Sequence, residues 1–298
     1  MLKKRLMKHQ EERDALILLL PLILLMLVFT VYPVLANFYY SMTKWKGFGT
    51  AEWVGLKNYA TLLQDVKFWH SLKNLSVLIA YIPAGVFLPL LIAAILRDGL
   101  KGWTFFRSVI YLPNILGYVI LGTLFSILLS QRGPLIELLT MLGVQDANRI
   151  NILGQSNSAI HMVSLLFVIL MKMGFGCIYF LAAMSSIDSS MYDAAGIDGA
   201  NWWQRFWNIT VPSISFSIQF FVVLSFIEVF ARMYSFIYTL TYGGPGFATF
   251  TLEFGIYRQG FKAFKMGYAS SWAVVLFFFC SAIAALQIYV IRKGDQLQ

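Results

Sequence analysis

Apolar residues come in six long runs that are separated by more polar segments. The runs cover about 16–36, 74–96, 107–130, 159–183, 212–236 and 268–291. Each approaches or exceeds the roughly 20 residues that an α-helix needs to cross the hydrocarbon core of a bilayer. They are continuous rather than alternating, unlike the strands of a membrane β-barrel. The pattern predicts an all-α integral membrane protein with six transmembrane helices, and we read residues 1–298 as one domain.

The basic residues predict the orientation of these helices. Residues 1–14 are polar and precede the first apolar run, and a second basic cluster lies in the short loop between Arg97 and Arg107. Because basic loops stay in the cytoplasm, both termini and the loop at 184–211 are predicted to be cytoplasmic. The first run is too long for a cleaved signal peptide, so we expect it to remain as a span. The N-terminal basic residues are Lys3, Lys4, Arg5, Lys8 and Arg13.

Composition excludes several other classes of protein. The chain is 59% hydrophobic and 12% charged, whereas a soluble domain has about a quarter charged residues. The net charge of +9 fits loop topology and lipid contact, so we do not predict nucleic-acid binding. The two cysteines, Cys177 and Cys280, lie inside apolar runs, and the three histidines fall in separate segments. Neither a disulfide framework nor a metal site is predicted.

The predicted outside loop at 37–73 is amphipathic and rich in aromatic residues. Such residues form a belt where a membrane meets water, or they form a docking surface for a soluble partner. Both interpretations fit this loop. The aromatic residues are Trp45, Trp53, Tyr59, Phe68 and Trp69.

The segment from Tyr192 to Pro212 is unusually polar for its place between two apolar runs. Ser189–Ser190 are predicted to cap a helix that starts near Met191, which places Asp193 in the first turn, where the helix dipole favours a carboxylate. Gly199 allows a turn. A bulky face follows at Trp202, Trp203 and Phe206. These features fit either a knob that docks a partner or a helix lying on lipid headgroups.

The same segment resembles the cytoplasmic EAA loop of ABC importer permeases. That motif runs EAA, three residues, Gly, nine residues and I-x-L-P. This chain has Asp193-Ala194-Ala195, then Gly199, then Ile209-Thr210-Val211-Pro212, with every spacing kept and with Asp and Val in place of Glu and Leu. Three stretches resemble the carbohydrate-uptake branch, which includes maltose-type and multiple-sugar permeases: "AGIDGANWWQRFWNITVP", "WVGLKNYATLL" and "LTYGGPGFATF", the last with Thr241, Gly243, Gly244 and Pro245.

The resemblance implies the type I importer permease fold and a transport subunit rather than an enzyme. It implies a second, usually non-identical permease, two ATPase subunits, a periplasmic or extracellular solute-binding protein, and the cytoplasmic membrane of a bacterium or archaeon. The chain has no P-loop GxxxxGK[ST], so ATP and Mg are expected on the partner ATPase and no cofactor on this chain. The residues implied to couple to the ATPase are Tyr192, Asp193, Ala194, Ala195, Asp198, Gly199, Ala200, Phe206 and Pro212.

Three charged residues stand out inside the apolar runs, where charges are costly and are functional candidates: Lys172, Glu228 and Arg232. Glu228 and Arg232 are four residues apart, so they share a helix face and can pair. Such a pair either holds helices together, with Lys172 reaching outward to the headgroups, or lines a substrate path. An intramembrane enzyme would need a further acid, or a Ser/His or His/Asp set, at the same depth.

The resemblance to maltose-type permeases extends to a sugar pocket on the spans that flank the EAA loop. Two cations and one acid leave this pocket with a net charge of +1, which favours an acidic oligosaccharide such as one containing uronate or sialic acid. A glycerol-phosphate-type substrate would also favour a basic pocket, and an ATP-independent transporter or channel is a further alternative. By counting outward from the loop, the implied pocket residues are Met171, Lys172, Phe175, Ser225, Glu228, Val229 and Arg232.

Overall fold

The computed structural model describes residues 17–97, 99, 103–145 and 150–295. Five helices are long and apolar enough to cross a membrane, and a pair of helices bent by 75° makes a sixth span if the pair is counted as one. The prediction of an all-α membrane protein is confirmed. Residues 1–14 lie outside the described residues, and the orientation of the termini stays a prediction. The spans are Ile17–Ser41, Val66–Arg97, Phe105–Leu128, Ser158–Met184, the pair Trp202–Ser213 with Ser215–Ala231, and Met266–Tyr289.

The described chain divides into two compact units, of which one comprises residues 17–62 and 258–274. Its first span continues from a π-helical segment into α2, and a short hairpin follows in which Thr43 pairs with Trp53. Gly267 lets α16 approach this hairpin, because a Cβ there would stand 1.9 Å from the Thr43 carbonyl oxygen. The elements are η1 (Leu27–Val31), α2 (Tyr32–Ser41), β1 (Thr43–Lys44), β2 (Glu52–Trp53), most of α3 (Lys57–Gln64), η5 (Arg258–Lys262) and the start of α16 (Met266–Asp295).

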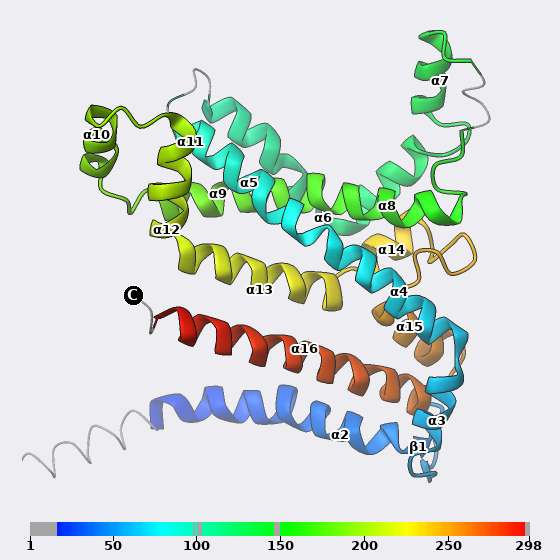
Figure 1. Cartoon of the computed structure of the whole chain (residues 1–298). Coiled ribbons are helices and arrows are strands. Elements are labelled where there is room, and N and C mark those ends of the chain that lie inside the picture. Colours follow the sequence, from blue (N-terminus) through cyan, green and yellow to red (C-terminus); the bar gives the residue numbers. More distant parts are fainter. Residues whose placement is uncertain (1–16, 98, 100–102, 146–149, 296–298) are drawn as a thin grey trace, which may run out of the picture. The chain divides into compact units, whose positions relative to one another are not determined.

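The second unit comprises residues 63–257 and 275 onward, and it carries the predicted site residues. Within it, α5 packs mainly on α9, α6 packs on α14 and α9, and α13 packs on α5 (Figure 1). Its elements are α4 (Val66–Ala80), α5 (Ile82–Arg97), α6 (Trp103–Leu128), α7 (Pro134–Met141), α8 (Ser156–Leu166), η3 (Phe167–Lys172), α9 (Met173–Met184), α10 (Ser189–Ile197), α11 (Trp202–Arg205), η4 (Phe206–Thr210), α12 (Val211–Ser213), α13 (Ser215–Ala231), α14 (Tyr234–Leu240), α15 (Leu252–Tyr257) and the end of α16.

Close helix packing in the second unit depends on Gly176 of α9. A Cβ at this position would stand 2.7 Å from Cζ of Phe221 and 2.8 Å from Cβ of Pro89. Glycine therefore lets α9 lie against both α13 and α5, at the centre of the unit. Phe221 and Phe180 are fully buried there, and their ring centroids are 4.8 Å apart.

Two helix boundaries differ from those predicted by the hydrophobic pattern. The second span starts at Val66 rather than near residue 74, because the Asp65 carboxylate caps α4 by accepting a hydrogen bond from the Lys67 backbone N–H at 2.9 Å. The fifth run bends at Ile214 and its helix ends at Ala231, whereas the sequence predicted a run to about residue 236. Polar helix starts and bends within apolar sequence are invisible to a hydropathy pattern.

The aromatic residues of the predicted outside loop have different environments. Trp45 stacks on Tyr40 with the ring centroids 4.2 Å apart, and the Tyr59 hydroxyl lies 2.7 Å from the hydroxyl of Ser41. Trp53 and Trp69 are exposed, whereas Phe68 is buried in the second unit. Phe68 is therefore a core residue, and Trp53 and Trp69 remain candidates for a lipid or partner contact.

Candidate functional site

The helix α10 presents the residues of the EAA-like motif, and it is capped by Asp188. The Asp188 carboxylate accepts a hydrogen bond from the Ser190 backbone N–H at 2.9 Å, and hydrogen bonds with Ser190 lower the pKa of this carboxyl. The predicted cap at Ser189–Ser190 is therefore wrong. Asp188 is the cap, and α10 starts at Ser189 rather than near Met191, since aspartate caps a helix as well as serine does. Asp193 consequently lies beyond the first turn, where the helix dipole has little effect.

The chain turns at Gly199, as the sequence predicted. Gly199 has a φ of +76°, a left-handed conformation that glycine adopts without strain. The backbone N–H of Ala200 bonds to the carbonyl of Ala195 at 2.9 Å, which satisfies one of the free carbonyls at the end of α10. A glycine after a helix end is the typical residue for this motif, so its place could be predicted from sequence.

The helix α11 begins with a capping box that the sequence analysis missed. The Asn201 side chain accepts from the Gln204 backbone N–H at 2.9 Å, and the Gln204 side chain accepts from the Asn201 backbone N–H at 2.8 Å. The available signal was a Gln three residues after an Asn, the spacing of a capping box. Trp203 of α11 is exposed, whereas Phe206, which follows α11, is buried, so the predicted bulky face is divided between core and surface.

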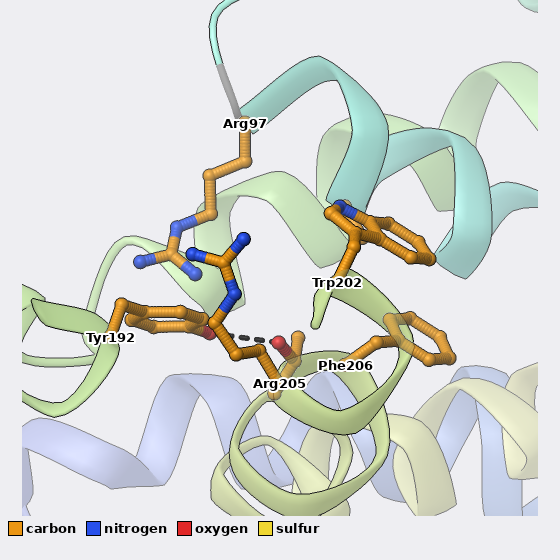
Figure 2. Close-up of a pocket in the computed structure, with 7 residues that line it drawn as sticks. Arg97, Tyr192, Trp202, Arg205 and Phe206 are labelled. Atoms are coloured by element: carbon orange, nitrogen blue, oxygen red, sulfur yellow. Dashed lines mark hydrogen bonds between the residues drawn. The ribbon is translucent and has the colours of Figure 1, made fainter. Parts of the chain in front are cut away.

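Tyr192 connects α10 to the start of the next span. Its hydroxyl lies 2.8 Å from the Thr210 hydroxyl, and the Arg97 guanidinium lies 3.8 Å from the centre of its ring. A guanidinium over an aromatic face is a favourable contact. Three elements, α5, α10 and η4, are therefore connected through one side chain (Figure 2).

The outward surface of this segment carries most of the motif. Ala195 and Ala200 are partly exposed. Met191 and Ile197 add exposed apolar side chains that the sequence analysis did not select, and Ile197 is 88% exposed. The sequence signal for the exposure of Ile197 was its place between Gly196 and Asp198, at the end of a predicted helix with polar residues. The exposed motif residues are Asp193, Ala194, Asp198, Gly199 and Pro212.

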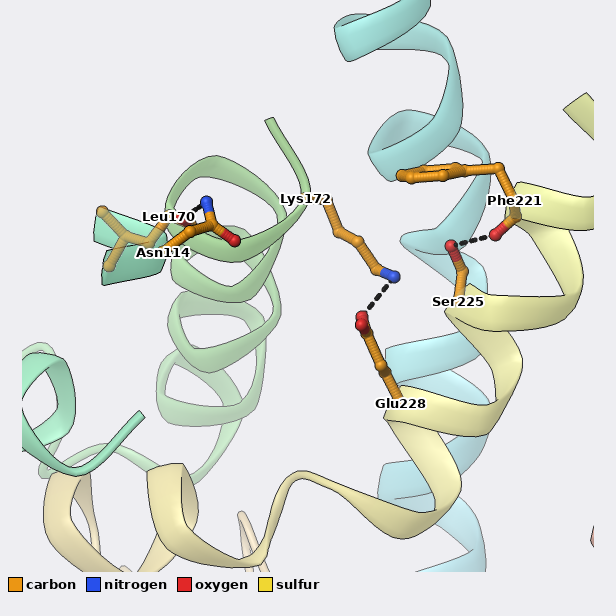
Figure 3. A network of polar contacts seen from close by, with 6 residues as sticks. All are labelled: Asn114, Leu170, Lys172, Phe221, Ser225 and Glu228. Carbon is orange, nitrogen blue, oxygen red and sulfur yellow. Dashed lines mark hydrogen bonds and ion pairs between the residues drawn. The ribbon is translucent and has the colours of Figure 1, made fainter. Parts of the chain in front are cut away.

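Among the charged residues of the spans, Lys172 pairs with Glu228 (Figure 3). Lys172 ends the π-helical segment η3 and its side chain is 2% exposed, while Glu228 lies on α13 and its side chain is 20% exposed. The predicted pair of Glu228 with Arg232 is thus wrong. The helix α13 ends at Ala231, and Arg232 is its C-cap. The Arg232 backbone N–H still bonds to the Glu228 carbonyl at 3.0 Å, but Arg232 has a φ of −138° and is exposed, while the Glu228 carboxylate pairs with Lys172. The alternative in which Lys172 reaches outward is also wrong.

The surroundings of Lys172 are aromatic and closely packed. Its Nζ lies 5.1 Å from the ring centroid of Phe221 and 5.6 Å from that of Phe167. Gly85 of α5 leaves room for its stem, since an added Cβ there would stand 3.4 Å from Cγ of Lys172. On the other side of η3, the Asn114 side chain donates a hydrogen bond to the Leu170 carbonyl at 3.2 Å. The ammonium is therefore compensated by one carboxylate and two aromatic faces.

The seven predicted pocket residues fall into a buried and an accessible group. Met171, Ser225 and Val229 are buried, and the Ser225 hydroxyl donates to the Phe221 carbonyl at 2.8 Å. Phe175 is 38% exposed and Arg232 is exposed. With Lys172 paired inside, Phe175, Glu228 and Arg232 are the members that a ligand can reach.

An exposed row of aromatic rings adjoins Phe175. Phe175 stacks on Tyr179 with centroids 6.1 Å apart, and Tyr179 stacks on Phe220 with centroids 6.4 Å apart. Phe220 is 43% exposed. The sequence analysis did not select Tyr179 or Phe220, whose contact requires α9 and α13 to be packed together.

The Gly-Gly-Pro segment follows α14 and is held by threonine hydroxyls. The Thr241 and Thr249 hydroxyls are 2.6 Å apart, and Thr249 also donates to the Gly244 carbonyl at 3.0 Å. Gly244 and Pro245 are joined by a cis peptide bond. The residues that line an open hollow beside this segment include Ser126, Ser130, Tyr238 and Thr239.

Glu253 stabilises the start of α14 and makes stability depend on pH. Its carboxylate accepts from the Tyr234 backbone N–H at 2.7 Å, and burial raises its pKa from 4.5 to about 7. The folded protein favours the protonated form of Glu253. This contribution to the free energy of unfolding is fully present below pH 4.5 and is lost as the pH rises through about 7. Between pH 4.5 and 8, we therefore expect the free energy of unfolding of wild type to fall by about 3 kcal/mol relative to that of Glu253→Gln. Thermal unfolding of both proteins in detergent across this range measures the difference, and parallel curves would contradict the expectation.

Comparison with known proteins identifies the family. Residues 60–293 match the family described as binding-protein-dependent transport system inner membrane component, and the chain belongs to this family. The identification as an ABC importer permease of the carbohydrate-uptake branch is confirmed.

Three curated relatives illustrate the range of this family. The multiple sugar-binding transport system permease protein MsmF of Streptococcus mutans is 31% identical over 93% of this chain and 94% of its own length. The probable starch degradation products transport system permease protein AmyD of Thermoanaerobacterium thermosulfurigenes is 29% identical over 92% of both chains. The sn-glycerol-3-phosphate transport system permease protein UgpA of Agrobacterium fabrum is 28% identical over 93% of this chain and 94% of its own length.

Among solved structures, this chain is similar to one from a bacterial ABC transporter that imports the acidic polysaccharide alginate. The TM-score is 0.79, with 25% identity and 99% of both chains covered. A second alginate transporter structure, in complex with an alginate pentasaccharide-bound periplasmic protein, has the same TM-score at 24% identity over 96% of both chains.

Proposed function

We propose that this chain is the permease subunit of an ATP-driven, binding-protein-dependent importer, and that the segment from Tyr192 to Pro212 couples it to a separate ATPase. The observation that carries the proposal is the way the motif is displayed. Asp193, Ala194 and Gly199 face solvent, while Tyr192 on the same helix is fixed to Thr210. A partner that binds the exposed side thus displaces a helix connected to the spans.

In this proposal, the contacts of Tyr192 transmit movements of α10 to the spans. A rigid-body shift of α10 reaches the fifth span through Thr210 and the second span through Arg97. Such a shift biases a two-state equilibrium only if a partner binds the two states with different affinity. An ATPase that closes when it binds ATP and opens after hydrolysis meets this requirement.

The proposed assembly contains further chains. A second, non-identical permease completes the translocation path, two ATPase subunits bind ATP and Mg in the cytoplasm, and a solute-binding protein delivers substrate from outside. In this arrangement the chain lies in the cytoplasmic membrane of a bacterium or archaeon with both termini inside. The structural neighbour crystallised with a periplasmic protein supports the last of these partners.

For the substrate we propose an acidic oligosaccharide. Lys172 and Glu228 neutralise each other, which leaves the exposed Arg232 as the excess positive charge. The exposed rings of Phe175 and Phe220 suit the flat face of a sugar ring, a contact that glycerol phosphate lacks. The alginate transporter supports this choice, whereas the glycerol-phosphate relatives support the alternative.

The test is purification of the complete complex from the native host, followed by ATPase measurements in proteoliposomes. We expect an ATPase and a second permease to co-purify. With its binding protein present, ATPase activity should be stimulated by a uronate oligosaccharide and less by a neutral one of the same length. Stimulation by glycerol phosphate alone would favour the alternative, and absence of any ATPase from a folded preparation would overturn the importer assembly. Arg232→Gln should reduce uptake of the acidic oligosaccharide selectively, with Arg132→Gln, an exposed arginine outside the pocket, as control.

A further inference from the structure

A small pocket lies where the end of α5 meets α10 and the segment α11–η4 (Figure 2). Its lining includes the guanidinium groups of Arg97 and Arg205, the ring of Tyr192, and the side chains of Trp202 and Thr210. Figure 2 shows the two arginine side chains turned toward each other, and both are half-buried. Two like charges are thus held together in a partly dehydrated place.

Neither guanidinium has a carboxylate partner among the described residues. Among the described residues, the buried Nε of Arg205 makes no hydrogen bond, and the Arg97 guanidinium lies 3.8 Å from the centre of the Tyr192 ring. The hydroxyls of Tyr192 and Thr210 bond to each other. Both groups are neutral, so they do not balance the charge of the arginines. Counted over the described residues, the lining of the pocket therefore has a surplus of two positive charges and one buried N–H donor without a partner, the Nε of Arg205.

A helix dipole explains the place of Arg97 but not the pairing of the two arginines. Arg97 lies in the last turn of α5, where a basic residue is favourable, whereas Arg205 ends α11, which continues directly into η4. The helix dipole does not require the two guanidinium groups to share one pocket. Their proximity adds repulsion between two like charges. An anion bound between them removes this repulsion.

The position of the pocket indicates which anion it binds. Arg97 is the last residue of the span Val66–Arg97, and Trp202 is the first residue of the bent pair that forms the fifth span. The pocket therefore lies where apolar helices end, at the level of lipid headgroups, and Trp and Tyr are enriched at this level. Basic pockets between membrane helices bind phosphorylated headgroups, and the guanidinium fork matches the geometry of phosphate.

We propose that this pocket binds the phosphate group of an anionic phospholipid, held by N–H donors of Arg97 and Arg205. Bound lipid would hold α10 against α5 and so set the position of the segment that we assign to ATPase coupling. The lipid site itself depends neither on the transported substrate nor on the identity of the ATPase. Its failure and that of the proposed importer function are therefore distinguishable.

The test is native mass spectrometry of the full-length protein, with the partners that co-purify, after stepwise removal of lipid. Phosphatidylglycerol is added back, and phosphatidylcholine and inorganic phosphate serve as separate comparisons. We expect retained phosphatidylglycerol, and about a tenfold loss of its apparent affinity for each of Arg97→Gln and Arg205→Gln, since a charge-assisted bond to phosphate is lost. Arg132→Gln removes the same charge from an exposed loop and should leave binding unchanged.

Other outcomes separate the possible sources of the anion. Equal binding of phosphatidylglycerol by wild type and by Arg97→Gln/Arg205→Gln would overturn the proposal. Competition by millimolar inorganic phosphate with the same affinity would assign the pocket to a free anion instead of a lipid. Loss of the co-purified ATPase with unchanged lipid binding would show that the arginines serve a protein carboxylate. If the double variant does not fold, Arg97→Lys and Arg205→Lys, which keep the charge but lose the fork, give the same test with a smaller expected loss.

Discussion

Lys172→Met is expected to destabilise the protein by about 3 kcal/mol, because it leaves Glu228 without its cation in an apolar surrounding. Glu228→Gln should have a similar effect, since the buried ammonium then loses its carboxylate. The double variant Lys172→Met/Glu228→Gln should recover most of the lost stability, because no charge remains unpaired. Thermal unfolding of the four proteins in one detergent measures these free energies as a double-mutant cycle.

Transport assays with the same variants separate the structural role of the pair from a role in recognition. If the pair only holds η3 and α13 together, the double variant should import the acidic oligosaccharide as wild type does. If Lys172 also binds substrate when the pair opens, the double variant should be stable but slow with acidic substrates. A Lys172→Ala variant that is as stable as wild type and imports every acidic substrate equally would contradict both roles.

Gly199→Ala is expected to weaken ATPase attachment, because alanine does not readily adopt the φ of +76° found at this position. The left-handed conformation costs a non-glycine residue about 1–2 kcal/mol, which reorients α10 or loosens its end. Gly199→Arg should have a larger effect, since its side chain also projects into the proposed docking surface. Co-purification of the ATPase and substrate-stimulated ATP hydrolysis measure the loss.

Gly196 provides a matched control for Gly199. It lies three residues earlier in α10, and an added Cβ meets no other atom within 4 Å at either position. Gly196 is helical, so Gly196→Ala should stabilise α10 by about 0.5–1 kcal/mol and keep the ATPase bound. Equal loss of the ATPase in both alanine variants would mean that the surface itself, rather than the turn at Gly199, is sensitive to substitution.

The sequence was most informative where the signal is local. Apolar run length predicts the spans, and the motif spacing around Gly199 predicts a turn that its backbone conformation requires. Asp188 and Asn201 were missed as caps although both are adjacent to the predicted helices. Serine, aspartate and asparagine cap equally well, so a choice among neighbouring candidates needs the backbone geometry.

The partner of Glu228 is a non-local feature that the helical spacing rule did not find. That rule compares residues on one helix and selected Arg232, but α13 ends before Arg232 and Lys172 lies on a different span. The aromatic row from Phe175 to Phe220 has the same origin, since it depends on how α9 and α13 are packed. The bend of 75° near Ile214 also lies within apolar sequence, where hydropathy gives no indication of it.

The π-helical segments η3 and η4 have a mechanical consequence for the two spans that flank the coupling segment. Each wide turn holds roughly one residue more than an α-helical turn, and one residue corresponds to about 100° of rotation about a helix axis. Lys172 ends η3, and Thr210, which bonds to Tyr192, ends η4. If a wide turn migrates by one position, the side chains that it passes change their facing while the helix ends stay in place. Each of the two spans therefore contains a segment in which the helical register can shift. One segment lies beside the buried ion pair, and the other lies where Thr210 contacts Tyr192 of α10.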